Sequence, residues 1–288
     1  MRQDGCPARI AGARVPAVLN RSRKSRFVAD LALQAFVLLF IAAFVAGFVD
    51  SIAGGGGLIT LPAMLIAGIP PLQTLGTNKL QSQFGALSAT LAYARKGHVD
   101  LKAQRPMATM AVLGGAVGAM IATIVPGEAL RVLMPFLLVA IALYFAFKPN
   151  LSDEDRHRRL SHTLFGVTVV PAIGLYDGIF GPGTGSFFML AFVSLAGFGM
   201  LKATAHTKLL NLGSNVGAFV VFLMTGAVLW KIGLLMGLGQ FLGAQTGSRL
   251  AMRNGAKIIR PLLVVTCLAL ATKLLSDPAN PVRMWLGV

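Results

Sequence analysis

A long apolar run that ends in an aspartate and four glycines constrains this chain more than any other stretch. The run from Leu31 to Val49 carries no charged side chain and is close to the roughly 20 residues that a helix needs to cross a bilayer. It is longer than the apolar core of a signal peptide and therefore predicts a first transmembrane helix. Asp50 and the glycines at 54–57 then interrupt the helix where lipid offers no hydrogen bonds to freed backbone groups.

The composition indicates a membrane protein along the whole chain. Of the 288 residues, 55% are hydrophobic and 12% are charged, which is too little charge for the surface of a soluble protein. The formal net charge is +16, but the basic residues stand in short blocks between apolar segments, as the positive-inside rule describes. This distribution favours the lipid bilayer as a partner and argues against nucleic acid.

The sequence contains an internal repeat. The stretch AGFVDSIAGGGG corresponds to AIGLYDGIFGPGTG, and TNKLQSQFG corresponds to HTKLLNLGSN. The matched positions are Asp50 with Asp177, Gly54 with Gly181, and Lys79 with Lys208. We therefore predict two homologous transmembrane repeats, at residues 31–148 and 162–276.

Each repeat contains five apolar segments. They are 31–52, 58–69, 74–94, 106–125 and 130–147 in the first repeat, and 162–179, 185–197, 203–223, 232–250 and 258–275 in the second. The segment at 58–69 would be about 18 Å long as a helix, which is too short for a hydrocarbon core of about 30 Å. The predicted fold class is an all-α membrane protein, a polytopic helix bundle of about 8 transmembrane helices plus two short broken or re-entrant elements.

Three polar segments frame the repeats. Residues 1–30 form a basic tail without apolar periodicity, which predicts a disordered segment in the cytoplasm. Residues 149–161 form a charged linker, and residues 277–288 form a short C-terminal tail. The basic blocks leave the orientation of the repeats open: charge is swapped between equivalent loops, as in an inverted repeat, whereas the basic linker favours a parallel one.

Glycines one helical turn apart occur in corresponding places of the two repeats. They are Gly114 with Gly118 and Gly243 with Gly247. Small residues at this spacing are typical of close packing between transmembrane helices. We therefore assign these four glycines to helix packing rather than to a binding site.

Each repeat places an acidic and a basic residue in apolar surroundings: Asp50 and Lys79 in the first, Asp177 and Lys208 in the second. A charge at the centre of a transmembrane helix costs about 2.5 to 3.5 kcal/mol, so such residues pair or face a cavity. We expect Asp50 to pair with Lys79 and Asp177 with Lys208. These could be structural ion pairs that fasten the broken helices, but their position beside the helix breaks favours a role in the substrate path.

The helix breaks also predict an anion site. A short helix begins after each break, and its first N–H groups lack intrahelical acceptors and carry the positive end of the helix dipole. Polar residues on the third segment of each repeat could be interhelical hydrogen-bonding groups or substrate ligands, and a lone histidine is more typical of a satisfied polar residue than of a proton carrier. The predicted substrate-binding or translocation residues are Asp50, Gly54, Gly55, Gly56, Gly57, Asn78, Lys79, Gln81, Asp177, Gly181, Gly183, Gly185, His206, Thr207, Lys208 and Asn211.

Motifs of enzymes are missing from the sequence. It has no nucleophile elbow, no phosphate-binding lysine loop and no cluster of metal-ligating residues. The two cysteines, Cys6 and Cys267, have no spacing that suggests a metal site or a disulfide. We therefore predict no enzyme activity, no catalytic residues, no cofactor and no metal.

Several stretches resemble a known family. FVDSIAGGGGLITLPA, LGTNKLQ, GLYDGIFGPGTGSFFMLAFV and ATAHTKLLNLGSN are similar to the sulfite exporter TauE/SafE family of bacterial inner-membrane permeases. The similarity runs from Leu33 to Leu275 and leaves out the basic tail. It implies a duplicated multi-helix permease in the bacterial inner membrane and, for some members, movement of sulfite, sulfoacetate or other sulfur-containing organic anions.

Together these features predict a secondary transporter for a small anion such as sulfite, an organosulfonate or a related oxyanion. The two breaks would meet near the membrane midplane, the lysines would supply charge to the anion, and the aspartates would orient the lysines or carry a coupling proton. Proton or sodium could be the coupling ion, and the chain could form a homo-oligomer. The alternative is a non-transporting membrane scaffold or assembly component.

Overall fold

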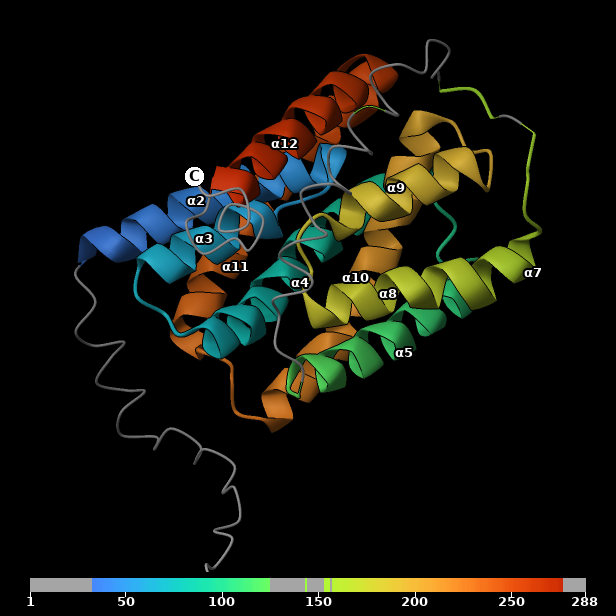
Figure 1. Cartoon of the computed structure of the whole chain (residues 1–288). Helices are drawn as coiled ribbons and strands as arrows, with labels where there is room; N and C mark the ends of the chain where they lie inside the picture. The colour runs from blue at the N-terminus through green and yellow to red at the C-terminus, as the bar shows by residue number, and fades with distance from the viewer. Residues whose placement is uncertain (1–32, 125–142, 144–152, 156, 277–288) are drawn as a thin grey trace, which may run out of the picture.

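All regular secondary structure in the described part of the chain is helical (Figure 1). The computed structural model describes residues 33–124, 143, 153–155 and 157–276. The predicted tail at 1–30, all of the predicted crossing at 130–147 except residue 143, and the C-terminal residues 277–288 lie outside these ranges. Within them no strand occurs, which confirms the all-α prediction.

The helices follow the predicted apolar segments closely. They are α2 (Leu33–Ala53), α3 (Gly57–Ile66), α4 (Pro71–Arg95), α5 (Arg105–Ala122), α7 (His162–Leu164), η1 (Phe165–Val169), α8 (Val170–Ile179), α9 (Thr184–Ser194), α10 (Met200–Met224), α11 (Trp230–Asn254) and α12 (Ala256–Ser276). α7, η1 and α8 follow one another without a break, so they form one helix that contains a single π-helical turn.

Helix length separates two kinds of element. Among the described helices, α2, α5, the continuous helix from His162 to Ile179, and α10 are long and apolar enough to cross a membrane. α3 and α9 are also apolar but have only 10 and 11 residues, which gives about 15 to 17 Å of helix. That is roughly half of a hydrocarbon core of about 30 Å. The two short elements predicted after the breaks are therefore present.

Polar side chains point inward and large apolar side chains point outward. Lys79 and Lys208 are 1% and 0% exposed, whereas Ile66, Ile124 and Met224 are 85%, 81% and 83% exposed. Soluble proteins almost never bury a lysine fully unless it is paired, and they keep most large aliphatic side chains inside. A lipid-facing surface accounts for this distribution.

α2, α4 and α11 form a first bundle of parallel helices. A Cβ on Gly243 would lie 1.9 Å from the carbonyl oxygen of Phe44, and one on Gly247 would lie 2.4 Å from that of Phe48, so contacts advance in the same direction along α2 and α11. This close approach confirms that the pair serves helix packing. The contacts between α4 and α11 advance in the same way, Leu80 with Gly233 and Phe84 with Gly237.

α5, α8 and α10 form a second bundle of parallel helices. A Cβ on Gly114 would lie 2.4 Å from the carbonyl oxygen of Pro171, and one on Gly118 would lie 2.0 Å from that of Leu175. The packing role predicted for these glycines is confirmed as well. α10 joins the bundle through contacts of Gly213 with Ala108 and of Gly217 with Val112.

The two bundles run in opposite directions. The backbone N–H of Leu229, beyond the end of α10, donates to Thr77 Oγ1 in the first turns of α4 at 3.0 Å. Gln104, beyond the end of α4, donates to the carbonyl oxygen of His206 near the start of α10 at 3.5 Å. α4 and α10 are therefore antiparallel, and in Figure 1 α2 begins on the left while α7 begins on the right. Each bundle takes two helices from one half of the chain and one from the other.

The linker between the two halves connects the starts of two helices, α10 and α12, through Asp153 and Asp155, which we call the linker latch. Asp153 accepts hydrogen bonds from the N–H groups of Leu201 and Ala256, both at 3.0 Å, and so caps α10 and α12 together. Asp155 accepts a hydrogen bond from Lys202 Nζ. Partial burial acts to raise the pKa of Asp155, but the hydrogen bonds from Lys202 and from a backbone N–H hold it below its ordinary value of 3.8.

Candidate functional site

The two helix breaks lie directly against each other. A Cβ on Gly54 would lie 2.5 Å from the backbone nitrogen of Ser186, and one on Gly185 would lie 2.7 Å from the Cα of Gly54. Ser186 Oγ also donates to the carbonyl oxygen of Ala53 at 3.0 Å. Side chains at Gly54 and Gly185 would push the two backbones apart, so the contact between the breaks requires glycine at both positions.

Left-handed backbone turns the chain out of each long helix. After α2, Gly54 and Gly55 have φ values of +82° and +94°; after α8, Gly181 and Gly183 have φ values of +91° and +81°. Residues with a Cβ rarely adopt this conformation. The glycine-rich sequences therefore end the long helices and allow α3 and α9 to start within a few residues.

Buried ion pairs connect the two halves of the chain. Lys79 Nζ lies 2.9 Å from Asp177 Oδ1, and Lys208 Nζ lies 3.5 Å from Asp50 Oδ2. The predicted pairs, Asp50 with Lys79 and Asp177 with Lys208, are therefore wrong. The reason is geometric: α4 passes beside the end of α8, and α10 passes beside the end of α2, so each lysine reaches the break of the other half.

Each lysine also binds the end of a long helix. Lys79 Nζ donates to the carbonyl oxygen of Asp177 at 2.5 Å, and Lys208 Nζ donates to the carbonyl oxygen of Asp50. These carbonyls belong to the last turns of α8 and α2, where the helix dipole is negative, and that of Asp50 also accepts a hydrogen bond from the N–H of Gly54 at 2.9 Å. The ammonium groups thus stabilise the ends of the interrupted helices.

Each aspartate in turn reaches across its own break. Asp50 Oδ1 accepts a hydrogen bond from the N–H of Gly56 at 3.0 Å. Asp177 Oδ1 accepts one from Thr184 Oγ1 at 2.8 Å, and its Oδ2 accepts one from Ser214 Oγ on α10 at 2.6 Å. Both carboxylates therefore link the end of a long helix to the start of the following short helix.

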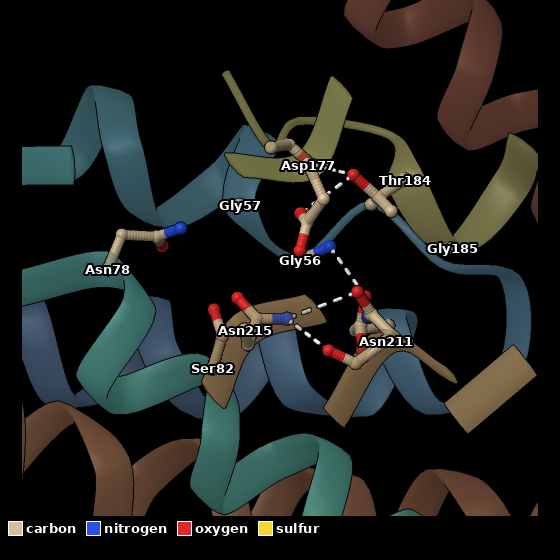
Figure 2. A pocket seen from close by; sticks show the side chains of 12 residues that line it. Gly56, Gly57, Asn78, Ser82, Asp177, Thr184, Gly185, Asn211 and Asn215 are labelled. Atoms are coloured by element: carbon tan, nitrogen blue, oxygen red, sulfur yellow. Dashed lines mark hydrogen bonds between the residues drawn. The ribbon is translucent and has the colours of Figure 1, made fainter. Parts of the chain in front are cut away.

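A small polar cavity lies between the breaks (Figure 2). The centre of a water-sized molecule can move within about 20 Å³ of it, which is room for one such molecule. The residues that line it are Asp50, Gly55, Gly56, Gly57, Asn78, Ser82, Asp177, Gly181, Thr184, Gly185, Asn211 and Asn215. They come from both halves of the chain.

The cavity separates the predicted site residues into two groups. Those that line it are Asp50, Gly55, Gly56, Gly57, Asn78, Asp177, Gly181, Gly185 and Asn211, and those that do not are Gly54, Lys79, Gln81, Gly183, His206, Thr207 and Lys208. Three lining residues, Ser82, Thr184 and Asn215, were missing from the prediction. Ser82 and Asn215 belong to the polar stripes of α4 and α10, whose residues the sequence left open as interhelical hydrogen-bonding groups or substrate ligands. Thr184 carried a weaker signal, a hydroxyl at the first position after a helix break.

Asn78 presents an amide group to the cavity. Its Oδ1 accepts hydrogen bonds from Thr60 Oγ1 at 2.7 Å and from Gln81 Nε2 at 2.8 Å. These donors orient the amide so that Nδ2 points toward Gly57 and the cavity (Figure 2). Within the described ranges Nδ2 has no protein acceptor, so it is available to a ligand. Gln81 acts behind the site by holding this orientation.

Two more amides face the cavity from α10. Asn215 Nδ2 donates to the carbonyl oxygen of Asn211 at 2.7 Å and to its Oδ1 at 3.1 Å. As far as the structure describes the chain, Asn211 Nδ2 has no acceptor. The cavity therefore has an available amide donor from each half, one on α4 and one on α10.

His206 lies away from the cavity, in a cluster of aromatic rings. Its ring centroid is 5.7 Å from that of Phe192 and 4.9 Å from that of Phe198, both in edge-to-face geometry. Such contacts are typical of a packed side chain. They agree with the interpretation of His206 as a satisfied polar residue.

Comparison with known proteins gives matches along nearly the whole apolar chain. The family model of the sulfite exporter TauE/SafE matches residues 39–274. The "Probable membrane transporter protein ORF9" of Sinorhizobium sp is 69% identical over 258 residues, which cover 90% of this chain and 99% of the relative. The "Probable membrane transporter protein YfcA" of Escherichia coli K12 is 45% identical over 252 residues, which cover 87% of this chain and 94% of the relative. No solved structure matches.

Proposed function

Because the chain belongs to the sulfite exporter TauE/SafE family, we propose that it is a secondary transporter that moves a small anion across the bacterial inner membrane. The chain is a multi-pass membrane protein related to bacterial membrane transporters. Its relatives bear the names of transporters, which favours transport over catalysis. The proposed substrates are sulfite, an organosulfonate or a related oxyanion.

The meeting of two short helices at one polar cavity is the observation that carries the proposal. α3 begins at Gly57 and α9 begins at Thr184, and both residues line the cavity. Helix N-termini attract anions through their free N–H groups and their positive dipole ends. The two lining carboxylates are each balanced by a lysine, so the charged side chains sum to about zero and the helix dipoles favour an anion.

In this proposal the lysines act indirectly. Lys79 and Lys208 bind carboxylates and helix ends and do not line the cavity. They neutralise the two aspartates so that an anion can approach them. Hydrogen bonds to the anion would come from Asn78, Asn211 and those backbone N–H groups at the two breaks that do not already donate within the protein.

The size of the cavity implies that loading requires movement. It holds a single water-sized molecule, and an oxyanion with three oxygens is larger. The breaks must therefore move apart for the anion to enter. Since Gly54 and Gly185 come from different halves of the chain, rocking of one half against the other would open the site alternately to each side.

The directions of the helices support an inverted repeat. α2 and α4 run opposite to their sequence counterparts α8 and α10, and α5 runs opposite to α11. With the predicted crossing at 130–147, the full-length helices are α2, α4, α5, the helix from His162 to Ile179, α10, α11 and α12. We propose eight crossings and two half-length elements, arranged as two homologous repeats of opposite orientation.

One end of the molecule carries most of the described basic residues. This basic end comprises Arg95, Lys96, Lys102, Arg105, Arg158, Arg159, Lys202, Arg249, Arg253 and Lys257. The positive-inside rule favours the cytoplasm for it. α2 begins at the opposite end, so the basic tail and the basic end cannot both be cytoplasmic. We propose that the basic end is cytoplasmic because its charges stand in short loops beside several helices.

Cysteine labelling in intact cells tests this orientation. In a chain without Cys6 and Cys267, single cysteines replace the exposed residues Lys231, at the start of α11, or Lys102, in the loop before α5. A maleimide that cannot cross the inner membrane should label Lys231→Cys and leave Lys102→Cys unlabelled. The reverse result would place the basic end outside and support a cytoplasmic tail.

Exchange in proteoliposomes tests the transport function. Purified full-length protein is assayed for counterflow of labelled sulfite, thiosulfate, sulfoacetate and a simple carboxylate, with and without proton and sodium gradients. We expect exchange of at least one sulfur anion, and a loss of about tenfold to a hundredfold with Asn78→Ala, because a hydrogen bond to a charged group contributes about 1.5 to 3 kcal/mol. The control Asn254→Ala, exposed at the end of α11, should behave like the wild type. Correctly inserted protein that exchanges none of these anions would favour the scaffold alternative.

A further inference from the structure

We infer that Asp50 is the carboxylate that takes up and releases a coupling proton, while Asp177 stays ionised as a fixed structural partner. This inference rests on the proposed transport function and assigns to one half of the site a role that the other half lacks. It follows from the different surroundings of two carboxylates that occupy corresponding positions in the two repeats.

Asp177 is held by three side-chain donors. Its carboxylate lies 2.9 Å from Lys79 Nζ and accepts hydrogen bonds from Thr184 Oγ1 at 2.8 Å and Ser214 Oγ at 2.6 Å. Its side chain is 3% exposed. Charge-assisted hydrogen bonds of this kind favour the ionised form. A proton on Asp177 would disrupt the ion pair or displace a hydroxyl donor.

Asp50 is held much more loosely. Its Oδ1 accepts one hydrogen bond, from the N–H of Gly56 at 3.0 Å, and its Oδ2 is 3.5 Å from Lys208 Nζ. The side chain is 10% exposed and lines the cavity. Among the described residues no hydroxyl group donates to it. Asp50 Oδ2 can therefore accept a proton at the expense of one long ion pair and no other contact.

The amino-acid sequence explains the difference. In the alignment that matches the two aspartates, Gly57 occupies the place of Thr184, and in the alignment that matches the two lysines, Gly85 occupies the place of Ser214. The first repeat thus has glycine at both positions from which the second repeat supplies a hydroxyl. Gly85 also has no space for a side chain, because a Cβ there would lie 2.7 Å from Cγ of Gln240.

Proton binding at Asp50 would change the charge of the site. The proton forms an O–H bond at Oδ2 and neutralises the carboxylate, while Lys208 keeps its ammonium charge and its bond to the carbonyl oxygen of Asp50. The two ion pairs, which together are neutral, then leave one net positive charge beside the cavity. An anion would bind more tightly in that state and would in turn favour the proton, since linkage is reciprocal.

Among the titratable groups on the helices around the cavity, Asp50 is the one best placed to take up and release a proton. α10 contributes Lys208, α4 contributes Lys79 and Tyr93, and α8 contributes Asp177 across the cavity. Tyr93 donates its hydroxyl to the carbonyl oxygen of Ser51 at 3.0 Å. α3 and α9 have no titratable side chain, and α12 has no acidic side chain. α11 carries Lys231 in its first turn and Arg249 and Arg253 in its last two turns, with no titratable side chain between them.

Anion exchange at different pH values tests the assignment. Wild type, Asp50→Asn and Asp177→Asn are assayed with labelled sulfite and, separately, labelled thiosulfate, from neutral to mildly acidic pH. Protonation of the anion itself is the same for all proteins, so differences between variants report on the protein. We expect exchange by the wild type to rise about tenfold toward acidic pH, Asp50→Asn to lose this dependence, and Asp177→Asn to keep it at a reduced rate.

A second pair of variants tests the same inference without removing a charge. A Cβ on Gly57 would lie 3.5 Å from Asn78 Nδ2, an ordinary van der Waals contact, so Gly57→Thr can supply to Asp50 the hydroxyl that Thr184 supplies to Asp177. We expect it to move the pH of half-maximal exchange to lower pH by about one unit. Gly57→Ala is the matched control and should leave that pH unchanged.

The outcomes separate this inference from the proposed function. Exchange that is independent of pH in the wild type, or a pH dependence that Asp177→Asn abolishes and Asp50→Asn preserves, overturns the assignment and leaves anion transport standing. Equal shifts with Gly57→Thr and Gly57→Ala also overturn it. A correctly inserted wild type that exchanges neither anion overturns the proposed function and the assignment together.

Discussion

The break after α2 is a run of four glycines, whereas the break after α8 places a proline and a threonine among its glycines. Both turn through left-handed backbone, and both start a short helix at the same cavity. The difference lies in side chains: Thr184 and Ser214 donate to Asp177, and the first half of the chain has Gly57 and Gly85 at the matching sequence positions. The two breaks therefore have similar backbone geometry, but Asp177 accepts hydrogen bonds from two hydroxyl groups and Asp50 accepts none from the described residues.

Removal of a lysine should give the largest difference between the two breaks. Lys79→Ala leaves Asp177 fully buried without a counter-charge, which should lower the free energy of unfolding by about 3 to 5 kcal/mol. Lys208→Ala should have a smaller effect, because its ion pair is longer and Asp50 is more exposed. Thermal unfolding of the purified proteins in detergent measures both.

A double-mutant cycle checks the exchange of partners. Lys79→Ala should show a strong coupling energy with Asp177→Ala and close to none with Asp50→Ala. The opposite pattern would mean that the ion pairs stay within each half of the chain, as we expected from the sequence.

Substitution of glycines should distinguish the contact between the breaks from the cavity beside it. Gly54→Ala introduces a Cβ at a left-handed residue and 2.5 Å from the backbone of the other break. It should destabilise by more than the roughly 1 to 2 kcal/mol of the backbone strain alone. Gly57→Ala has ordinary contacts and should be neutral or stabilising by up to about 1 kcal/mol, since alanine favours helix. Equal effects on the unfolding temperature would show that the breaks are not in contact.

Loss of a hydroxyl should make the second break resemble the first. Thr184→Ala and Ser214→Ala each remove one hydrogen bond to Asp177 and should destabilise by about 1 to 2 kcal/mol. In the double variant, Lys79 is the one side-chain donor to Asp177 left among the described residues, so Lys79→Ala should cost more in this background than in the wild type. An unchanged cost in the same thermal assay would show that the hydroxyls do not stabilise the carboxylate.

Substitution in the linker latch should have the smallest effect on stability, because the side chain of Asp155 is exposed. The folded-state pKa of Asp155 is lowered, so its stabilising effect is present at neutral pH and is lost as the pH falls from 3.8 through the lower folded-state value. Its side chain is 47% exposed, so Asp155→Asn should destabilise by less than about 1 kcal/mol at neutral pH. The two proteins should become equally stable in acid; a difference that grows as the pH falls would contradict this.

Local patterns were sufficient to predict much of the fold. The segment expected at 203–223 is a helix from Met200 to Met224, and the short element expected at 185–197 is a helix from Thr184 to Ser194. The apolar pattern, the glycine runs and the membrane thickness limit the length and position of each helix separately. These features can therefore be read from one sequence without knowing how the helices pack.

The pairing of charges could not be predicted in this way. Each half of the chain supplies one aspartate and one lysine, so pairing within a half and pairing between halves look the same in sequence. The choice depends on α4 crossing to the end of α8, which is a property of the packed helices. Asn78 was expected on the polar stripe of its helix, and the structure shows it at the cavity. The lysines were expected to supply charge to the anion, and the structure shows each of them bound to a carboxylate from the other half of the chain.

The crossed ion pairs have a consequence for the order in which the chain becomes folded. When only the first half has been synthesised, Asp50 and Lys79 lack their partners in the second half. The first half alone therefore leaves two charged side chains without their native ion pairs. Two copies of such a half, inserted in opposite orientations, could satisfy each other, because the lysine of each would reach the aspartate of the other, as in a two-fold symmetric dimer. Under the proposed inverted repeat, the chain corresponds to an antiparallel dimer joined into one polypeptide, and its separately expressed halves should assemble with each other.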